Sequence, residues 1–337
     1  MTLRREFKHI GKTVNAVGYG AMSLSNFYGP IDHKGCLDIV AACYDLGVDH
    51  LDTANLYGRG NSETVIGEYL RDNPAARDFF TIATKGGIWI GDPNQGNDGF
   101  PNNNSKTFLE KCLDESLQKL GIDCVDIYYL HRWDQRLPIE EVTETLAGFV
   151  KAGKCKGIGF SEIAPSSIRR AAAIHPVTAV QSEYSLWTRL PELGVLQACE
   201  EVGATMVAFS PLGRGMLTDT YHSLEKAQTL PFLQNNPRFM SPNYEANVAH
   251  IDRFRQYARD LGWSTAGLAN AWTLAKGEHV LPIPGTRHKE HLAQCVQAMN
   301  TALSPDQVEE IERILPVGFA HGDRYSDAQY KGQERYC

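Results

Sequence analysis

The sequence lacks features that would assign it to several classes of protein. No run of eighteen apolar residues occurs, so we expect no membrane-spanning helix. The basic residues near the N-terminus, Arg4, Arg5 and Lys8, are not followed by an apolar stretch, so we expect no secretory signal. Acidic residues outnumber basic ones, 40 to 33, and the formal net charge is −7. This charge argues against binding nucleic acid or a membrane surface across the whole molecule.

Cysteine is present, but its spacing is not typical of disulfide frameworks or metal sites. The eight cysteines include no Cys-x-x-Cys pair, and a disulfide framework would be unusual in a chain of 337 residues. Cys36, Cys43, Cys112 and Cys199 fall in helix-like apolar stripes, where a reduced thiol behaves as a small hydrophobe. No His-x-x-x-His pair occurs either. We therefore expect a protein of the reducing cytosol without a metal site.

Short apolar runs alternate with helix-like segments along the whole chain. Eight runs are predicted to be strands: 17–20, 48–51, 79–84, 125–130, 157–160, 179–181, 205–209 and 280–283. Eight βα units favour a closed (β/α)8 TIM barrel over an open sheet. Residues 4–17 are predicted to form an N-terminal hairpin that turns at Gly11-Lys12. No low-complexity tract or Pro/Ser-rich linker divides the chain, so we expect one domain over residues 1–337.

The helix expected over residues 33–46 shows the periodicity on which these predictions depend. Leu37, Val40, Ala41 and Tyr44 recur at helical spacing, and Gly47 supplies a C-terminal stop. Two later helices repeat the design, with stripes Leu109, Leu113, Leu117 and Leu120 before Gly121 and Ile139, Val142, Leu146 and Phe149 before Gly153.

Three long polar segments interrupt the alternation, at 91–104, 213–244 and 316–337. Loops this long in a compact domain are usually functional or disordered. The first two follow strands, so we expect them at the rim of the active site, with the last segment folding over it.

Polar residues follow three of the apolar runs at the point where each run ends. Asp52 follows the second run, with Tyr57 five residues further on, Lys85 ends the third and His131 ends the fourth. Taken singly, each has an ordinary structural explanation as a cap, solvated or packing residue. In a barrel, however, the C-terminal ends of the strands converge on one face, where active sites lie. The sequence therefore predicts that these four side chains meet.

Together these side chains can deliver a proton to a carbonyl oxygen. A free phenol has a pKa of about 10, and a neighbouring ammonium favours its ionised form. We expect Tyr57 to donate the proton, Lys85 to assist it and Asp52 to compensate the lysine. His131 can position the substrate oxygen. None of these groups supplies electrons, so a reduction would need a hydride-carrying cofactor.

The usual dinucleotide motif Gly-x-Gly-x-x-Gly is missing, which disfavours a doubly wound fold. A phosphate site is instead expected over residues 284–289, Pro-Gly-Thr-Arg-His-Lys, after the eighth strand at a helix start. Its three basic side chains suit a 2′-phosphate, although a basic helix cap is an alternative explanation.

With the motif Asp52-Thr53-Ala54-x-x-Tyr57-Gly58, Lys85 and His131, the chain resembles the aldo-keto reductases over nearly its whole length. Residues 159–162 and 181–187 are similar to those of the group that contains fungal pyridoxal reductases and bacterial general reductases. The resemblance implies a (β/α)8 barrel that uses NADPH to reduce aldehydes or ketones, with Asp52, Tyr57, Lys85 and His131 as the catalytic residues.

The resemblance also implies a set of cofactor-binding residues. Ser161 and Gln181 would hold the nicotinamide carboxamide, beside Glu162, which stands where many relatives have asparagine. Phe209 would offer an aromatic face to the ring. Ser210, Leu212, Gly213 and Arg214 would line the pyrophosphate, with Arg238 as a clamp, and Gly285, Arg287 and His291 would surround the 2′-phosphate and ribose. The set is completed by Met22, Pro211, Gly215, Pro284, Thr286, Gln294 and Cys295, of which Gln294-Cys295 replaces the Glu-Asn pair that contacts adenine in the family.

Tyr28, Trp89 and Trp133 are candidate walls of an apolar substrate pocket, or equally packing residues. The candidate substrates include pyridoxal, quinones and sugar-derived or steroid-like ketones. We expect no nucleic-acid or membrane partner.

Two rival functions stay open at this point. Relatives of this fold serve as channel β-subunits that hold NADPH and turn over slowly, and multiple-turnover NADPH oxidation would separate that role from an enzyme. A lyase or isomerase could use Lys85 as a Schiff-base amine, which borohydride would trap. A nearby Asp52 that keeps the lysine charged argues against the second alternative.

Overall fold

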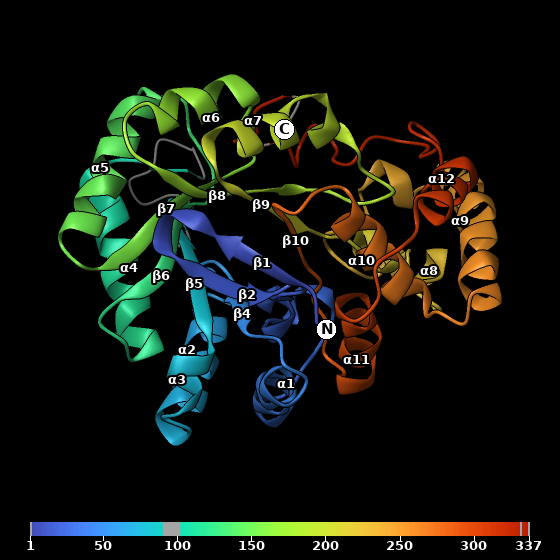
Figure 1. Cartoon of the computed structure of the whole chain (residues 1–337), viewed down its shortest axis with the longest axis horizontal. Coiled ribbons are helices and arrows are strands. Elements are labelled where there is room, and N and C mark those ends of the chain that lie inside the picture. The colour runs from blue at the N-terminus through green and yellow to red at the C-terminus, as the bar shows by residue number, and fades with distance from the viewer. Residues whose placement is uncertain (1, 90–101, 331, 336–337) are drawn as a thin grey trace.

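The fold is taken from a computed structural model that describes residues 2–89, 102–330 and 332–335 (Figure 1). Most of the polar segment predicted at 91–104 lies outside the described residues.

Eight parallel strands form the wall of a barrel and follow one another in sequence order. They are β3 (Tyr19–Gly20), β4 (His50–Asp52), β5 (Thr81–Gly86), β6 (Val125–Leu130), β7 (Cys155–Ser161), β8 (Val177–Glu183), β9 (Thr205–Phe209) and β10 (Val280–Ile283). The first and last strands meet where the N–H groups of Gly18 and Gly20 donate to the carbonyls of Pro282 and Pro284, at 3.0 and 3.1 Å. The predicted (β/α)8 barrel is confirmed.

An antiparallel hairpin precedes the barrel, as predicted. Its strands are β1 (Arg4–Phe7) and β2 (Lys12–Asn15), joined by the 3-10 turn η1 (Lys8–Ile10) and by Gly11 in the left-handed region. Phe7 and Val14 are buried against residues inside the barrel, among them Ile127 and Leu281. In Figure 1 the blue hairpin lies across the strands. It therefore covers the N-terminal end of the barrel and leaves the opposite end for a site.

Helices surround the barrel (Figure 1). They are α1 (His33–Asp45), α2 (Asn61–Asp72), α3 (Ala76–Phe79), α4 (Lys106–Leu120), α5 (Ile139–Lys151), α6 (Pro165–Ala172), α7 (Val195–Val202), α8 (Leu224–Gln228), α9 (Asn243–Asp260), α10 (Thr265–Ala275), α11 (Lys289–Val296) and α12 (Pro305–Ile314). Further 3-10 turns are η2 (Ala21–Leu24), η3 (Asn26–Tyr28), η4 (Leu190–Leu193), η5 (Gly213–Gly215), η6 (Pro237–Phe239) and η7 (Gln297–Met299). Apolar side chains fill the layer between helices and strands. Within the described residues, no helix is both long and apolar enough to span a bilayer.

The predicted helix over 33–46 forms, but its buried face was assigned wrongly in part. The buried residues of α1 are Cys36, Ile39, Val40, Ala42 and Cys43. Tyr44 is 41% exposed and packs its ring against α3 instead. Leu37 and Ala41 are only partly buried, whereas Cys36 and Cys43 are buried as small apolar residues, as the sequence predicts. The leucine stripe of α4 and the apolar stripe of α5 face the core as predicted.

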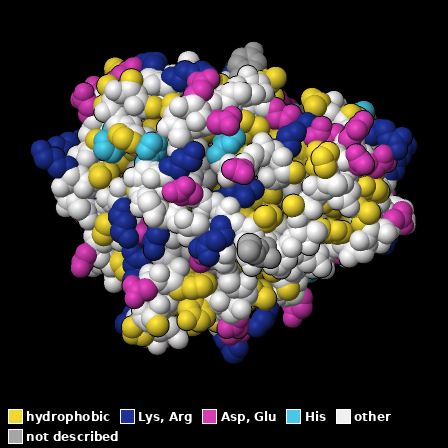
Figure 2. Space-filling view, in the orientation of Figure 1, with side chains coloured by type: hydrophobic (Ala, Val, Ile, Leu, Met, Phe, Trp, Pro, Cys, Tyr) yellow, Lys and Arg dark blue, Asp and Glu magenta, His cyan; other side chains and the backbone are white. Residues whose placement is uncertain are grey.

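Two segments extend from the helical layer to the C-terminal ends of the strands. One connects β9 to α9, over residues 210–242, and carries η5, α8 and η6. The other is the C-terminal tail, residues 315–330 and 332–335, which runs from α12 back over the barrel towards α6 (Figure 1). On the face drawn in Figure 2, acidic and basic side chains are interspersed and do not form a field of one sign.

Candidate active site

A cleft with a volume of about 720 Å³ lies at the C-terminal ends of the strands. Strand-end residues form its base, among them Asp52, His131, Ser161 and Gln181. Loop residues from η3, the 210–242 connection and the tail form its sides. The cleft is thus at the barrel face on which the sequence predicts the four polar side chains.

Lys85 is fully buried beneath this cleft and links two of the other predicted residues. Its ammonium pairs with the carboxylate of Asp52 and donates to the carbonyl oxygen of Thr53 at 2.9 Å and to the hydroxyl of Tyr57 at 3.2 Å. A lysine has three donors, so all of them have partners. The position of the ammonium relative to the phenol is therefore fixed.

The electrostatic balance keeps Lys85 charged. Burial by itself lowers the pKa of Lys85, but the Asp52 carboxylate and the Tyr57 oxygen outweigh it, and the pKa lies above its ordinary value. A permanent ammonium beside the Tyr57 oxygen stabilises negative charge on that oxygen. The arrangement can therefore release a proton from the phenol into the cleft.

His131 lies beside Tyr57, with ring centroids 5.9 Å apart and ring planes almost perpendicular. Burial, reinforced by the charges of Arg132 and Lys85, holds the pKa of His131 well below its usual range. The imidazole is therefore neutral near pH 7 and can act as a hydrogen-bonding group without adding charge. Its Nδ1 is buried and makes no hydrogen bond to the described residues.

Ser161 and Gln181, at the ends of β7 and β8, form what we call the β7–β8 shelf. Both are 2% exposed and line the cleft. The hydroxyl of Ser161 accepts from Arg132 at 2.9 Å. The amide of Gln181 donates to the second carboxylate oxygen of Asp52 at 2.8 Å. The shelf is therefore connected directly to the Asp52–Lys85–Tyr57 contacts.

Most of the other residues that the resemblance assigns to the cofactor also line the cleft. These are Met22, Phe209, Ser210, Pro211, Leu212, Arg214, Gly215, Pro284, Gly285, Thr286, Arg287, His291, Gln294 and Cys295, and Tyr28 of the expected substrate pocket lines it too. Arg287 at the far end donates to the carbonyl of Pro30 at 2.9 Å. The fold thus brings residues from η2, the loop after β9 and the start of α11 to one surface.

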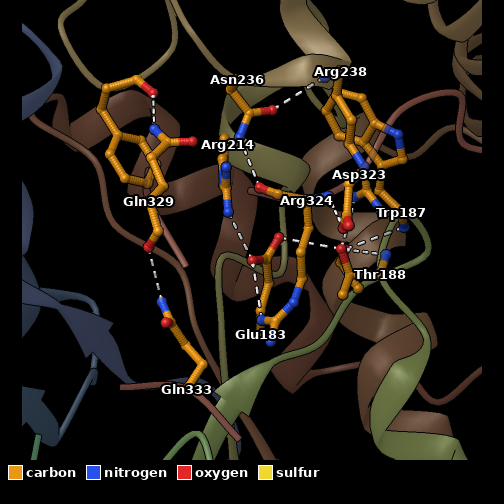
Figure 3. Close-up of polar contacts among 12 residues, drawn as sticks. Glu183, Trp187, Thr188, Arg214, Asn236, Arg238, Asp323, Arg324, Gln329 and Gln333 are labelled. Carbon is orange, nitrogen blue, oxygen red and sulfur yellow. Dashed lines mark hydrogen bonds and ion pairs between the residues drawn. The ribbon is translucent and has the colours of Figure 1, made fainter. Parts of the chain in front are cut away.

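Some predicted residues are not brought to the cleft. Glu162 is buried and pairs with Arg324 of the tail at 2.7 Å. Arg238 donates to the hydroxyl of Thr188 at 2.7 Å and lies over the ring of Trp187 (Figure 3). Neither side chain contributes to the cleft lining in this structure, so their contacts with the cofactor stay predictions from the resemblance.

Three further predicted residues, Trp133, Trp89 and Gly213, pack against other parts of the protein. Trp133 is buried in the core, and its indole N–H donates to the carbonyl of Leu137 at 2.9 Å. Trp89 packs its ring against Phe108. Gly213 is covered by the ring of Trp187. None of these three residues lines the cleft in this structure.

Several cleft residues were missed by the sequence reasoning. Three of them are aromatic residues from η3, the 210–242 connection and the tail: Phe27, Phe232 and Tyr325. Their rings form a row in which the ring of Phe232 lies between the other two, with centroids 4.9 Å from Phe27 and 6.2 Å from Tyr325. The guanidinium of Arg214 lies over the rings of both Phe232 and Tyr325, 4.9 and 4.7 Å from the centroids. No local pattern marks these aromatic residues. Arg132 also lines the cleft, and its place directly after His131 was the available signal.

Among the described residues, no group of three or more His, Cys, Asp and Glu side chains could hold a metal ion.

Residues 16–316 match the Aldo/keto reductase family. The chain is 37% identical to "Aldo-keto reductase yakc [NADP(+)]" of Schizosaccharomyces pombe, over 93% of this chain and 92% of that protein. It is 36% identical to "Probable aldo-keto reductase 1" of Glycine max, over 97% of this chain and 91% of that protein.

A solved structure of a glycerol dehydrogenase from Gluconobacter oxydans shares the fold, with a TM-score of 0.81 at 24% identity over 93% of this chain and 94% of that chain. The family match, the two relatives and the barrel lead to one conclusion. This chain belongs to the aldo/keto reductase family.

Proposed function

We propose that this protein is an NADPH-dependent oxidoreductase that reduces aldehydes and ketones to alcohols, with Tyr57 as the proton donor. The observation that carries the proposal is the contact between the Lys85 ammonium and the Tyr57 hydroxyl, 3.2 Å apart at the base of the cleft. The family membership and the name of the Schizosaccharomyces pombe relative, which includes NADP(+), support the choice of cofactor.

The residues of the cleft fit this cofactor. Ser161 and Gln181 offer a hydroxyl and an amide that would hold the nicotinamide carboxamide. One nitrogen of the Arg214 guanidinium is buried without a hydrogen-bond partner among the described residues, and Arg214 lines the cleft where the resemblance expects the pyrophosphate. Arg287 and His291 at the start of α11 would hold the 2′-phosphate, because basic side chains and a helix N-terminus both favour an anion.

When bound, the reduced nicotinamide supplies a hydride to the carbonyl carbon of the substrate. Tyr57 gives its proton to the carbonyl oxygen as negative charge develops there, and Lys85 stabilises the phenolate that remains. The neutral His131 orients the substrate oxygen. Asp52 holds Lys85, and Gln181 holds Asp52. Proton uptake from water restores the phenol for the next cycle.

The arrangement supports a reductase over a Schiff-base enzyme. A lysine forms a Schiff base through its neutral amine. The three partners of Lys85 and its raised pKa keep it protonated. We therefore assign Lys85 to proton transfer.

A single domain over residues 1–337 is also part of the proposal. So is a location in the cytosol, which is supported by the seven free cysteines among the described residues.

Replacing Tyr57 with phenylalanine tests the proposal. Tyr57→Phe removes the acidic hydroxyl and keeps the ring, so turnover should fall by ~10²–10⁴-fold while the dissociation constant for NADPH changes little. Steady-state NADPH oxidation with an aromatic aldehyde and fluorescence titration of NADPH give the two quantities. Tyr69→Phe, on α2, is the matched control. A Tyr57→Phe variant that turns over at the unmodified rate would remove Tyr57 as the acid.

A further inference from the structure

Two carboxylates are buried next to the β7–β8 shelf. Glu162 directly follows Ser161, and Glu183 lies two residues beyond Gln181. Glu162 is fully buried and Glu183 is 2% exposed. A buried carboxylate is strongly unfavourable unless a positive charge and hydrogen bonds compensate it. The compensation at this place comes from segments far away in the sequence.

Arg324 of the C-terminal tail supplies it. Its guanidinium lies 2.7 Å from the carboxylate of Glu162 and 3.6 Å from that of Glu183, and it is 1% exposed. Arg214 adds a second ion pair to Glu183 at 2.7 Å. Figure 3 shows Glu183 between Arg214 and Arg324. The tail therefore places a positive charge directly behind the shelf.

Glu162 joins this charge to the strand ends. One oxygen of its carboxylate pairs with Arg324, and the other accepts the backbone N–H of Glu183 at 2.9 Å. The backbone N–H of Glu162 donates to the carbonyl of Gln181 at 2.9 Å. The backbone of Glu162 also has a φ of +59°, in the left-handed region that residues other than glycine seldom adopt. Its contacts on both sides hold that conformation.

The tail reaches the end of β7 at a second point. The backbone N–H of Glu334 donates to the carbonyl of Glu162 at 3.0 Å. The carboxylate of Glu334 accepts from the N–H of Ala164 at 2.8 Å and from the hydroxyl of Ser167 at 3.0 Å. It thus caps α6, whose own N-cap residue, Ala164, has no side-chain acceptor.

We propose that Arg324 is a positioning residue for the cofactor site: by pairing with Glu162 it holds the ends of β7 and β8 so that Ser161 and Gln181 face the nicotinamide. The connection runs from Arg324 through Glu162 to Gln181, and from Gln181 through Asp52 to Lys85. Arg324 itself does not line the cleft. This inference rests on the proposed NADPH-binding function.

The test uses the full chain and four proteins: unmodified, Arg324→Met, the double variant Glu162→Gln with Arg324→Met, and Arg335→Met as the matched control. Arg335 is an exposed arginine of the same tail. For each protein, fluorescence titration gives the NADPH dissociation constant, thermal denaturation without cofactor gives the midpoint, and aldehyde reduction gives kcat and KM.

The inference predicts a characteristic pattern. Arg324→Met removes the positive charge that pairs with the Glu162 carboxylate, so the NADPH dissociation constant should rise by at least ~10-fold. The double variant removes both charges and should return to within roughly 3-fold of the unmodified protein. Arg335→Met should bind as the unmodified protein does.

Other results would overturn the inference. Unchanged NADPH affinity in Arg324→Met, with or without a lower melting midpoint, would reduce Arg324 to a structural contact. Equal losses in the single and double variants would show that fastening of the tail matters and charge compensation does not. If Arg324→Met does not fold, the double variant decides, because it must fold and bind NADPH. An unmodified protein that does not bind NADPH would overturn the proposed function as well, a result distinct from all of these.

Discussion

The ammonium of Lys85 donates its three N–H groups to Asp52, Thr53 and Tyr57, and these bonds hold the ammonium beside the Tyr57 hydroxyl. Asp52 offsets its charge, and Tyr57 receives the remaining N–H. A polar residue at the end of an apolar run is a local pattern, so Lys85 and His131 could be predicted as site residues from the sequence. The hydrogen bond from Gln181 to Asp52 could not be predicted, because it joins residues 129 positions apart.

Removing the lysine charge should reduce both stability and turnover. Lys85→Met leaves Asp52 buried without a counter-charge, which we expect to lower the free energy of unfolding by about 3–5 kcal/mol. The double variant Asp52→Asn with Lys85→Met should regain much of that stability in urea denaturation, yet remain inactive. Full activity in the double variant would contradict the role of Lys85.

The buried imidazole of His131 should make the free energy of unfolding depend on pH. Burial lowers the pKa of His131 in the folded state below its unfolded value, so the unfolded chain binds a proton first as the pH falls. Below the unfolded pKa of about 6.5, this histidine should lower the free energy of unfolding by about 1.4 kcal/mol per pH unit. That loss should continue until the pH reaches the folded pKa. His131→Gln should therefore lose less stability between pH 7 and pH 5 in urea denaturation. Parallel curves for the two proteins would exclude the effect.

At the scale of the elements, the barrel closes through a close backbone approach between the end of β3 and the residues that follow β10. A Cβ atom on Gly285 would lie 2.7 Å from the carbonyl oxygen of Gly20. The strands and the helices α4 and α5 could be predicted, because apolar runs and leucine spacing are local properties. The buried face of α1 could be predicted only in part. Cys36, Val40 and Cys43 are buried as expected, but Tyr44 packs its ring on Phe79 of α3, a contact between elements that no local pattern gives.

Two substitutions of glycine by alanine should change the stability of the protein in opposite directions. Gly285→Ala forces the backbone contact apart and should destabilise the protein by roughly 2 kcal/mol. Gly148→Ala, in the exposed interior of α5 with no atom within 4 Å of the added methyl group, should stabilise it by about 1 kcal/mol. Urea denaturation of the cofactor-free proteins measures both. If both substitutions changed the free energy of unfolding in the same direction, this result would be inconsistent with the close backbone approach at Gly285.

The start of α11 carries the expected preference for NADPH over NADH. Arg287→Ala removes a charged donor and should weaken NADPH binding by ~10–100-fold, with little effect on NADH. Lys34→Ala is the control, because Lys34 is an exposed lysine of α1 that pairs with Asp38 and does not line the cleft. Fluorescence titration with both nucleotides gives the ratio. Equal losses for the two nucleotides would argue against a 2′-phosphate contact at Arg287.

At the scale of the whole molecule, segments distant in sequence complete the site. The tail brings Arg324 to Glu162 and Tyr325 to the cleft, and the 210–242 connection brings Phe232. These contacts depend on how long loops fold back, which no periodicity reveals. The contacts of Glu162 with Arg324 and of Arg238 with Thr188 are of the same kind, and the motif residues beside them do not reveal these contacts.

The account depends on catalytic turnover at the barrel mouth, and a stoichiometric measurement tests this most directly. The purified protein is mixed with excess NADPH and an aromatic aldehyde, and NADPH loss and alcohol formation are followed together. We expect many moles of NADPH to be oxidised per mole of protein, with one alcohol formed for each. Tight NADPH binding with less than one oxidation per protein molecule would contradict the account and indicate a binding module instead.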